Sequence, residues 1–289
     1  PTMAAHPGGA PANFLAAVAQ FGGKAALLGK VGTDTFGKLL TGTLRKAGIE
    51  TKGIVASDDV FTTLAFVTLD ENGDREFAFA RKPGADTQLR FDELDLSLID
   101  ETRVFHFGTL SLTGEPARTT TYRAVEYAKA HGKLVTYDPN LRKPLWNDLN
   151  EAKEQMLWGL RQADVVKISD EEVEFLFGLG VQDGAQYILD HYPVKLVFVT
   201  CGADGCWFQN RNAGGHVDSL KDIKVVDTTG AGDIFGGSAV WKLLQTGKAP
   251  EDLTEAELRE IVSFACKAAG LSTTCLLYTS PSPRDISGS

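Results

Sequence analysis

The sequence predicts an α/β fold with a mostly parallel central sheet and a small, separate β lid. Short apolar runs typical of strands alternate along most of the chain with segments whose apolar residues follow helical spacing, as in parallel α/β proteins. Residues 62–80 interrupt this alternation with two β-rich runs joined by a hairpin signal. A glycine-rich stretch at residues 227–233 stands directly before a helical segment.

The composition is that of one large folded domain, or of a large domain with a small one. The chain has 289 residues, of which 43% are hydrophobic and 23% charged, so it can bury a sizeable core. No apolar run approaches the roughly 18 residues of a membrane span, and the net charge of −9 argues against general nucleic-acid binding. The 4 cysteines form no C-x-x-C pair, which indicates reduced thiols. We expect a cytoplasmic protein with neither a membrane nor a nucleic-acid partner.

The first predicted elements already alternate between helix and strand. Residues 8–13 open a helix, because Pro11 suits a first helical turn and apolar residues follow at helical spacing. Asn13 at this entry could hold a hydroxylated ligand, or the segment could be a plain turn. Residues 25–28 are predicted to be a buried strand and 29–32 a loop. Next, Asp34 caps a helix that Gly48 ends.

Residues 55–86 are predicted to form a β-hairpin lid. The runs 62–69 and 76–80 flank a turn centred on Asn72-Gly73. An aromatic and basic face alternates along the second run, at Phe77, Phe79 and Arg81. Since an antiparallel ribbon does not easily join the middle of a parallel sheet, it should project as a flap. The flap could close over a ligand and exclude water, or it could form a dimer contact, and the two roles can coexist.

The alternation resumes after Asp92 and completes the main domain, residues 1–54 and 87–274. Strand-like runs lie at 104–107, 134–137, 163–168 and 196–200. Polar loops follow three of them, at 138–142, 169–172 and 201–205. Such positions, at the carboxyl ends of parallel strands, are where open α/β sheets bind ligands. The acidic residues of the second loop usually satisfy a helix dipole, but one of them, directly or through water, could hold the Mg²⁺ that accompanies a nucleotide.

The glycine-rich stretch 227–233 is predicted to turn a short strand, residues 223–226, into a helix. The first N–H groups of a helix lack intrahelical partners and the dipole is positive there, so an anion fits. A carboxylate at this place, Asp233, could take a proton from an attacking hydroxyl in phosphoryl transfer. Considered alone, the stretch favours the alternative of an acidic cap after a tight turn. It matches neither the P-loop nor the G-x-G-x-x-G pattern, which argues against an NAD-dependent oxidoreductase.

Two segments together resemble the signatures of ribokinase-like (PfkB) sugar kinases: Gly-Gly-x-x-Ala-Asn at 8–13 and Asp-Thr-Thr-Gly-Ala-Gly-Asp at 227–233. Further segments look like the bacterial fructokinase branch: Lys-Pro-Gly-Ala-Asp at 82–86, Asp-Pro-Asn-Leu-Arg at 138–142, Lys-Ile-Ser-Asp-Glu-Glu at 167–172 and Val-Thr-Cys-Gly-Ala-Asp-Gly at 199–205. The resemblance covers roughly residues 6–274. It implies a three-layer α/β/α ribokinase-like fold.

The resemblance also implies roles for single residues. Asp233 matches the general base that deprotonates the sugar hydroxyl. Glu172 matches a carboxylate that acts near Mg²⁺ and the phosphates, although Ser169 replaces the Asn that begins the family's motif. The anion hole for the transferring phosphoryl group is expected from the backbone of Gly230, Ala231 and Gly232.

The remaining expected contacts divide by ligand. Sugar contacts are expected from Gly9 and Asn13, and on chemical grounds from Arg81 and Arg142. Nucleotide contacts are expected from Thr200, Gly202, Gly205 and Lys167. A monovalent-cation site, for K⁺, is expected at Asp227 and Thr229.

The expected reaction is the ATP-dependent phosphorylation of a primary hydroxyl, fructose to fructose 6-phosphate, by a homodimer that associates through the β lid. Within the same class, 2-keto-3-deoxygluconate kinase and other sugar or nucleoside kinases stay open, because Arg142 or Arg81 could meet a substrate carboxylate. A non-catalytic sugar-binding regulator on the same fold is the alternative of another class. Such a regulator has no need for an acid at Asp233.

Each end of the chain carries an expectation of its own. The family begins with a strand that carries a sugar-binding Asp, and the sequence starts after it, so we expect an incomplete sugar site and impaired activity for residues 1–289. Residues 275–289 resemble the translation of a sequencing adapter, and we expect an artefact there. The alternative is an ordinary disordered tail.

Overall fold

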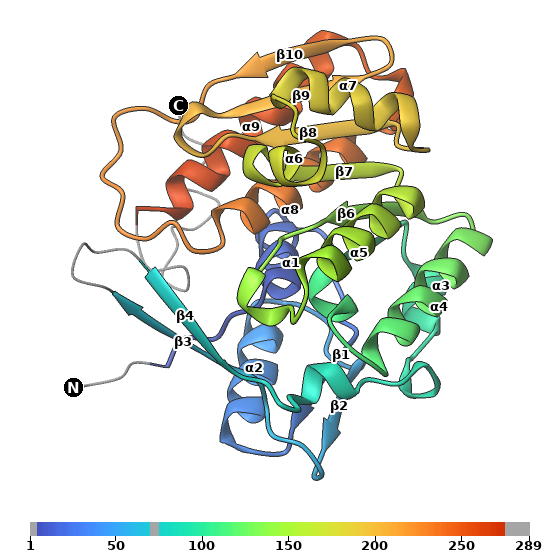
Figure 1. Ribbon diagram of the computed structural model, residues 1–289, viewed down its shortest axis with the longest axis vertical. Coiled ribbons are helices and arrows are strands. Elements are labelled where there is room, and N and C mark those ends of the chain that lie inside the picture. Colours follow the sequence, from blue (N-terminus) through green and yellow to red (C-terminus); the bar gives the residue numbers. More distant parts are fainter. Residues whose placement is uncertain (1–4, 70–74, 275–289) are drawn as a thin grey trace.

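A computed structural model describes residues 5–69 and 75–274 and shows three layers, α/β/α, around a six-stranded sheet (Figure 1). The strand order is β10-β9-β8-β7-β6-β5; β5 to β8 are parallel, and β9 and β10 are antiparallel. The strands are β5 (Val104–Gly108), β6 (Leu134–Asp138), β7 (Val165–Ser169), β8 (Leu196–Thr200), β9 (Cys206–Asn210) and β10 (Gly214–Val217). The predicted α/β class with a mostly parallel sheet is confirmed.

Helices cover both faces of this sheet, because its central strands are apolar on both sides. Val166 and Ile168 of β7 face a cluster formed with α4 to α7, whereas Val165 faces a second cluster formed with α8 and α9. This alternation follows from the period of 2 in a β-strand. α1 packs against α8. The helices are α1 (Ala10–Gln20), α2 (Thr35–Lys46), α3 (Ser97–Glu101), α4 (Ala117–Ala130), α5 (Leu149–Gln162), α6 (Asp170–Phe177), α7 (Val181–His191), α8 (Ala231–Thr246) and α9 (Glu255–Ser272).

The parallel strands end along one edge of the sheet. The register pairs Gly108 with Asp138 and Ser169 with Thr200, so β5 ends beside β6 and β7 ends beside β8. The loops that follow β6, β7 and β8 are therefore gathered at this edge. This places the predicted polar loops near one another.

The N-terminal strand prediction was wrong in position. Residues 25–28 contain only an isolated bridge, between Ala26 and Glu50, and the strand β1 (Gly29–Gly32) occupies the predicted loop. β1 pairs in parallel with β2 (Ile54–Ser57) in a two-stranded sheet of its own. Apolar content alone could not give this position, because backbone pairing with β2 defines the strand and its glycines need no apolar side chain.

The helix after this strand agrees with the prediction. The Asp34 carboxylate accepts hydrogen bonds from the N–H groups of Phe36 and Gly37 at 2.9 and 3.0 Å, so it caps α2. Gly48 follows the helix with a φ of 79°, a left-handed conformation that favours glycine. Local sequence signals therefore define both ends of α2.

An antiparallel hairpin stands apart from the main sheet. β3 (Leu64–Leu69) pairs with β4 (Arg75–Ala80), and the ribbon projects from the body of the molecule (Figure 1). The expected hairpin is confirmed as a separate two-stranded sheet. The predicted turn at Asn72-Gly73, the side chain of Phe77 and the tail 275–289 lie outside the described residues.

Candidate active site

The glycine-rich stretch leads into α8 through a left-handed residue. Gly230, the N-cap, has φ 77° and ψ 0°, a conformation that glycine adopts without the steric cost of a Cβ. Ala231, Gly232 and Asp233 form the first turn, at the positive end of the helix dipole. The Ala231 N–H donates to the Thr228 carbonyl at 3.2 Å, whereas the N–H groups of Gly232 and Asp233 have no intrahelical acceptor. This terminus can bind an anion.

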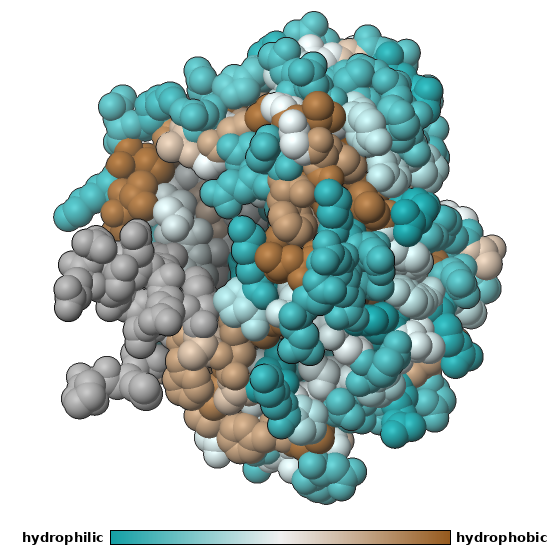
Figure 2. Space-filling model, viewed as in Figure 1, coloured by the Kyte–Doolittle hydropathy of each residue, from teal (hydrophilic) through white to brown (hydrophobic). Residues whose placement is uncertain are grey.

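The predicted strand before this stretch is wrong. Residues 223–226 form no strand, and Val225 and Val226 are 54% and 53% exposed. The N–H groups of Val226 and Asp227 donate to the Thr273 carbonyl at 2.7 and 3.1 Å, which ties the loop to the end of α9. An apolar patch lies over this loop in Figure 2. The apolar pattern was misleading because these side chains face outward instead of packing on a sheet.

Asp233 lies at the centre of a buried polar cluster. Its Oδ2 accepts a hydrogen bond from Asn13 Nδ2 of α1 at 2.8 Å, and its Oδ1 accepts one from Asn140 Nδ2 of the β6–α5 loop at 3.0 Å. All three side chains are buried. Two segments far apart in sequence therefore hold the carboxylate between them.

The surroundings of Asp233 shift its pKa upward. Burial raises the pKa of this carboxyl, and the opposing effects of the Asn13 hydrogen bond and the charges of Lys167 and Arg142 are smaller. The carboxylate is thus more basic than an exposed aspartate, while the amides keep it partnered. A base of this kind can accept a proton from a hydroxyl at near-neutral pH.

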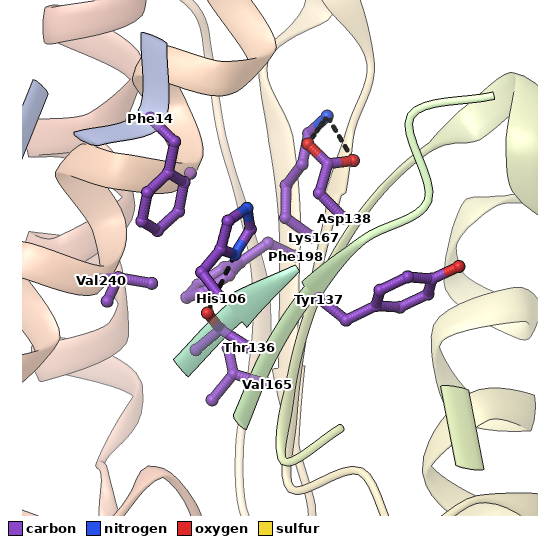
Figure 3. A pocket seen from close by; sticks show the side chains of 10 residues that line it. Phe14, His106, Thr136, Tyr137, Asp138, Val165, Lys167, Phe198 and Val240 are labelled. Atoms are coloured by element: carbon purple, nitrogen blue, oxygen red, sulfur yellow. Dashed lines mark hydrogen bonds and ion pairs between the residues drawn. The ribbon is translucent and has the colours of Figure 1, made fainter. Parts of the chain in front are cut away.

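A buried ion pair lies beside this cluster. Lys167 Nζ is 3.1 and 3.3 Å from the two carboxylate oxygens of Asp138, as Figure 3 shows. Because Val166 and Ile168 face away from α8, Lys167 between them points toward it, and a Cβ added to Gly232 would lie 2.9 Å from Nζ. The lysine therefore places a positive charge next to the anion-binding terminus.

The two members of this pair titrate differently. Burial raises the pKa of Asp138 to about 7, against the smaller opposing effect of Lys167. Burial alone would lower the pKa of Lys167, but the charges of Asp138, Glu172 and Asp233 outweigh it and raise that pKa. Lys167 therefore stays protonated at physiological pH and provides one positive charge beside the anion-binding terminus.

Glu172 connects two of the loops at the sheet edge. Its Oε2 accepts the Ser169 N–H at 2.9 Å, and Ser169 Oγ accepts the Glu172 N–H at 3.2 Å, which forms a capping box at the start of α6. Its Oε1 accepts the Leu141 N–H at 2.7 Å. Ser169, which stands where the family has Asn, thus serves as the helix cap, and Glu172 fixes the loop after β6.

The predicted nucleotide residues form a second, more open group. Thr200 ends β8, and the loop after it turns at Gly202 and Gly205, whose φ values of 54° and 103° are left-handed. A Cβ on Gly205 would lie 2.1 Å from the Val217 carbonyl oxygen, so the backbone passes close there. In the loop between β10 and α8, which we call the 220s loop (residues 218–230), Asp227 Oδ1 accepts the Thr229 N–H at 2.9 Å. Gly202 is exposed, whereas Gly205 is buried, with its N–H donating to the Gly202 carbonyl and its carbonyl accepting the Cys201 N–H.

The residues predicted to contact the sugar differ in their relation to Asp233. Asn13 reaches Asp233, and Gly9 begins the same helix with a φ of 121°. Arg142 is exposed, and its charge acts on Asp233. The Arg81 guanidinium, at the base of the hairpin, is instead bonded to Asp86, Thr113 and the Leu110 carbonyl. The contacts of Arg81 join the hairpin to the main domain.

Sequence reasoning did not assign three polar residues in or beside the cluster: Asp138, Asn140 and His106. Asp138 and Asn140 carry the signal of polar residues at the carboxyl end of a strand, which could have identified them. His106 stacks on Phe14 at 3.8 Å and pairs with Thr136 Oγ1 at 3.0 Å in a small cavity (Figure 3). Desolvation, with a smaller effect of Lys167, lowers its pKa to about 3, so the ring is neutral.

Within residues 5–69 and 75–274, no group of three or more His, Cys, Asp and Glu side chains is arranged as a metal site. A search of the same residues finds no helix long and apolar enough to cross a membrane.

Known proteins resemble this chain in sequence and in overall structure. Residues 1–285 match the family described as pfkB family carbohydrate kinase. The chain is 44% identical to probable fructokinase-3 of Arabidopsis thaliana over 269 residues, 93% of this chain and 77% of the relative. It superposes on fructokinase with bound ATP from Xylella fastidiosa with a TM-score of 0.89 at 31% identity, covering 96% and 88% of the two chains. For fructokinase from Vibrio cholerae O395 in a fructose, ADP and calcium ion bound form, the TM-score is 0.86 at 32% identity, with 96% and 89% covered.

Proposed function

Because the chain belongs to the pfkB family of carbohydrate kinases and is therefore a phosphotransferase with an alcohol group as acceptor, we propose that it phosphorylates fructose to fructose 6-phosphate with ATP. The observation that carries the proposal is Asp233 in the first turn of α8, buried and hydrogen-bonded, beside an anion-binding helix terminus. The names of the relatives and of the superposed structures support fructose and ATP as the substrates.

The proposed chemistry uses the chain's own groups in fixed places. The Asp233 carboxylate accepts the proton of the attacking sugar hydroxyl as the oxygen–phosphorus bond forms. The backbone of Gly230, Ala231 and Gly232, from the N-cap into the first turn of α8, stabilises the charge of the transferring phosphoryl group. Lys167, next to the same turn, adds a positive charge on the side of the phosphates.

The residues around Asp233 divide into a sugar side and a nucleotide side. On the sugar side we place Gly9, Asn13 and Arg142. Arg81 lies on the same side, at the base of the hairpin, but its guanidinium is already bonded to Asp86 and Thr113, so we propose no direct sugar contact for it. On the nucleotide side we place Thr200, Gly202 and Gly205.

A metal ion is part of the proposal. Mg²⁺ in phosphate sites is usually held by one or two carboxylates together with water and substrate phosphates. Glu172 fits such a role through water, because each of its oxygens already accepts a backbone N–H. The ion would neutralise charge on the transferring phosphates. The oxygens of Asp227 and Thr229 are the proposed ligands of K⁺.

The hairpin and the oligomeric state are proposals as well. We propose that residues 55–86 act as a lid on the main domain and form the contact of a homodimer. The separate pairing of β3 with β4 supports this, as does Phe66, which is 39% exposed on the ribbon. We place the enzyme in the cytoplasm.

The test of the proposed function is a panel of acceptors in a coupled assay of ADP release. Fructose, 2-keto-3-deoxygluconate and a nucleoside would be compared by kcat/KM at equal ATP. Fructose should give the highest value by about 10-fold or more, since a site built to bond a substrate hydroxyl rejects an analogue that lacks it. A higher kcat/KM for 2-keto-3-deoxygluconate than for fructose would identify the protein as a 2-keto-3-deoxygluconate kinase instead. Tight fructose binding without ADP release would indicate a regulator.

A further inference from the structure

The loop after β6 holds an asparagine in a backbone conformation that few residues adopt. Asn140 has a φ of 47°, and Asp222 is the other non-glycine residue with positive φ within the described chain. Asparagine tolerates this left-handed region better than most residues. From this backbone position the Asn140 amide donates to Asp233 Oδ1 at 3.0 Å.

The loop is fixed on both sides of Asn140. On one side, the Pro139 carbonyl accepts hydrogen bonds from both the N–H and the hydroxyl of Thr109. On the other side, the Leu141 N–H donates to Glu172 Oε1 at 2.7 Å. The peptide groups that flank Asn140 are therefore held by two different elements, which fixes the backbone from which its side chain extends.

We propose that Asn140 is a positioning residue, which fixes the Asp233 carboxylate for proton transfer, and that Glu172 holds Asn140 in place through Leu141. The inference rests on the proposed kinase function. Asn13 and Asn140 each bond a different oxygen of Asp233, so together they define the plane of the carboxylate. An oxygen with one amide donor keeps an acceptor site for the sugar hydroxyl.

The amide also affects the protonation of the base. A hydrogen bond donated to a carboxylate favours its charged form, so loss of Asn140 should raise the pKa of Asp233. The charged groups that face Asp233 are Lys167 from β7, Arg142 from the loop after β6, and Asp138 from β6. Substitution of Asn140 leaves all of them in place, so a change in the pH profile can be assigned to the amide.

The experiment uses two variants of the full chain with pH profiles of kcat/KM. Asn140→Gly keeps the left-handed backbone and removes the amide, and Asn140→Asp keeps the shape but replaces the donor with a second carboxylate. We expect kcat to fall about 10- to 100-fold in Asn140→Gly with little change in the KM for ATP, as for loss of a hydrogen bond to a charged group. The acidic limb should move to higher pH, and further in Asn140→Asp, because two adjacent carboxylates disfavour double ionisation.

Controls separate this inference from the proposed function. Asn212→Gly, in the exposed turn between β9 and β10, should leave the profile unchanged. Asp233→Asn should lower kcat by about 10²- to 10⁴-fold, and full turnover by this variant would refute the proposed function itself. An unmoved acidic limb in both Asn140 variants would overturn the positioning role, whatever the loss in kcat. A titration followed by carboxyl ¹³C NMR measures the same shift in the pKa of Asp233 without turnover. The Asp233 signal is identified because it is missing from the spectrum of Asp233→Asn.

Discussion

The two sides of the proposed active site are built differently. Around Asp233 the polar side chains are buried: Asn13 and Asn140 donate to Asp233, Asp138 pairs with Lys167, and Glu172 accepts backbone N–H groups. On the nucleotide side, Gly202 is exposed in the loop after β8 and Gly205 is buried there, while Val225 and Val226 are exposed in the neighbouring loop before α8. The acceptor side is thus organised before a ligand arrives, whereas the nucleotide side offers a surface that a ligand must complete.

Because of this difference, we expect substitutions on the two sides to have different effects. Buried polar groups depend on each other, because removal of one partner leaves another unsatisfied in a medium of low dielectric. Exposed loop groups have water as an alternative partner, so their substitution changes stability little. Changes on the acceptor side should therefore affect catalysis and folding strongly, and changes on the nucleotide side should affect mainly ligand constants.

The largest effect is expected at Asp233. Asp233→Asn preserves the shape of the side chain and removes the base, so kcat should fall by about 10²- to 10⁴-fold, the usual contribution of a general base. The affinity for ATP, measured by calorimetry, should stay within a few-fold. Full turnover by the variant, at a melting temperature equal to that of the wild type, would show that the proton leaves by another route.

The buried pair of Lys167 and Asp138 should show the next largest effect, on folding. Lys167→Met leaves Asp138 buried without its cation, which costs about 3–5 kcal/mol of unfolding free energy at pH values where Asp138 is ionised in the folded protein. Because burial already raises the pKa of Asp138 to about 7, above the value of 3.8 that it has when unfolded, the protonated carboxyl is favoured in the fold. The loss should therefore grow as pH rises through the folded pKa and shrink toward pH 4.

Urea unfolding at several pH values measures this loss. The double variant Asp138→Asn/Lys167→Met should recover much of the stability and lose the pH dependence, because no buried charge is left unpaired. Equal stability of Lys167→Met and the wild type at every pH would show that water reaches Asp138 in the folded protein.

The sequence was sufficient where the determining interactions are local. The cap of α2 at Asp34, the start of α8 after Gly230 and the hairpin follow from residues within a few positions of each other. The strands predicted at residues 25–28 and 223–226 were wrong, because apolar content does not show which backbone will pair or which side chains will face outward. Pairing partners lie elsewhere in the chain, where a local pattern cannot identify them.

The same limit applies to the site. The motif places Asp233 at the helix terminus, but the amide partner Asn140 lies 93 positions away and depends on a left-handed backbone. Glu172 shows the converse, since its sequence position suggests a metal ligand while its contacts make it a cap and a loop anchor. The capping box of Ser169 and Glu172 is local, but the bonds of Asn140 to Asp233 and of Leu141 to Glu172 are long-range and appear only once the chain is folded.

On the nucleotide side, Asp227→Ala tests whether the 220s loop binds a cation. The Asp227 carboxylate accepts the Thr229 N–H in an exposed loop, so its loss should change unfolding free energy by about 0.5 kcal/mol or less. Activation by K⁺ should be weakened, with a rise in the KM for ATP and little change in kcat at saturation. Kinetics in K⁺ against tetramethylammonium buffer would measure it. Equal activation of variant and wild type would exclude this carboxylate as a ligand.

The smallest effect on the kinetic constants is expected at Gly202. The glycine has a φ of 54°, and a Cβ there would meet no heavy atom within 4 Å, so Gly202→Ala should cost only the left-handed strain of about 1–2 kcal/mol. The matched control is Gly42→Ala in the middle of α2, where a Cβ also meets nothing and φ is not left-handed; this variant should gain about 0.5–1 kcal/mol. If Gly202 lies against the nucleotide, the KM for ATP should rise in its variant and not in the control. If Gly202→Ala lowers the unfolding free energy and Gly42→Ala raises it, while the two variants have equal KM values for ATP, Gly202 serves only the turn.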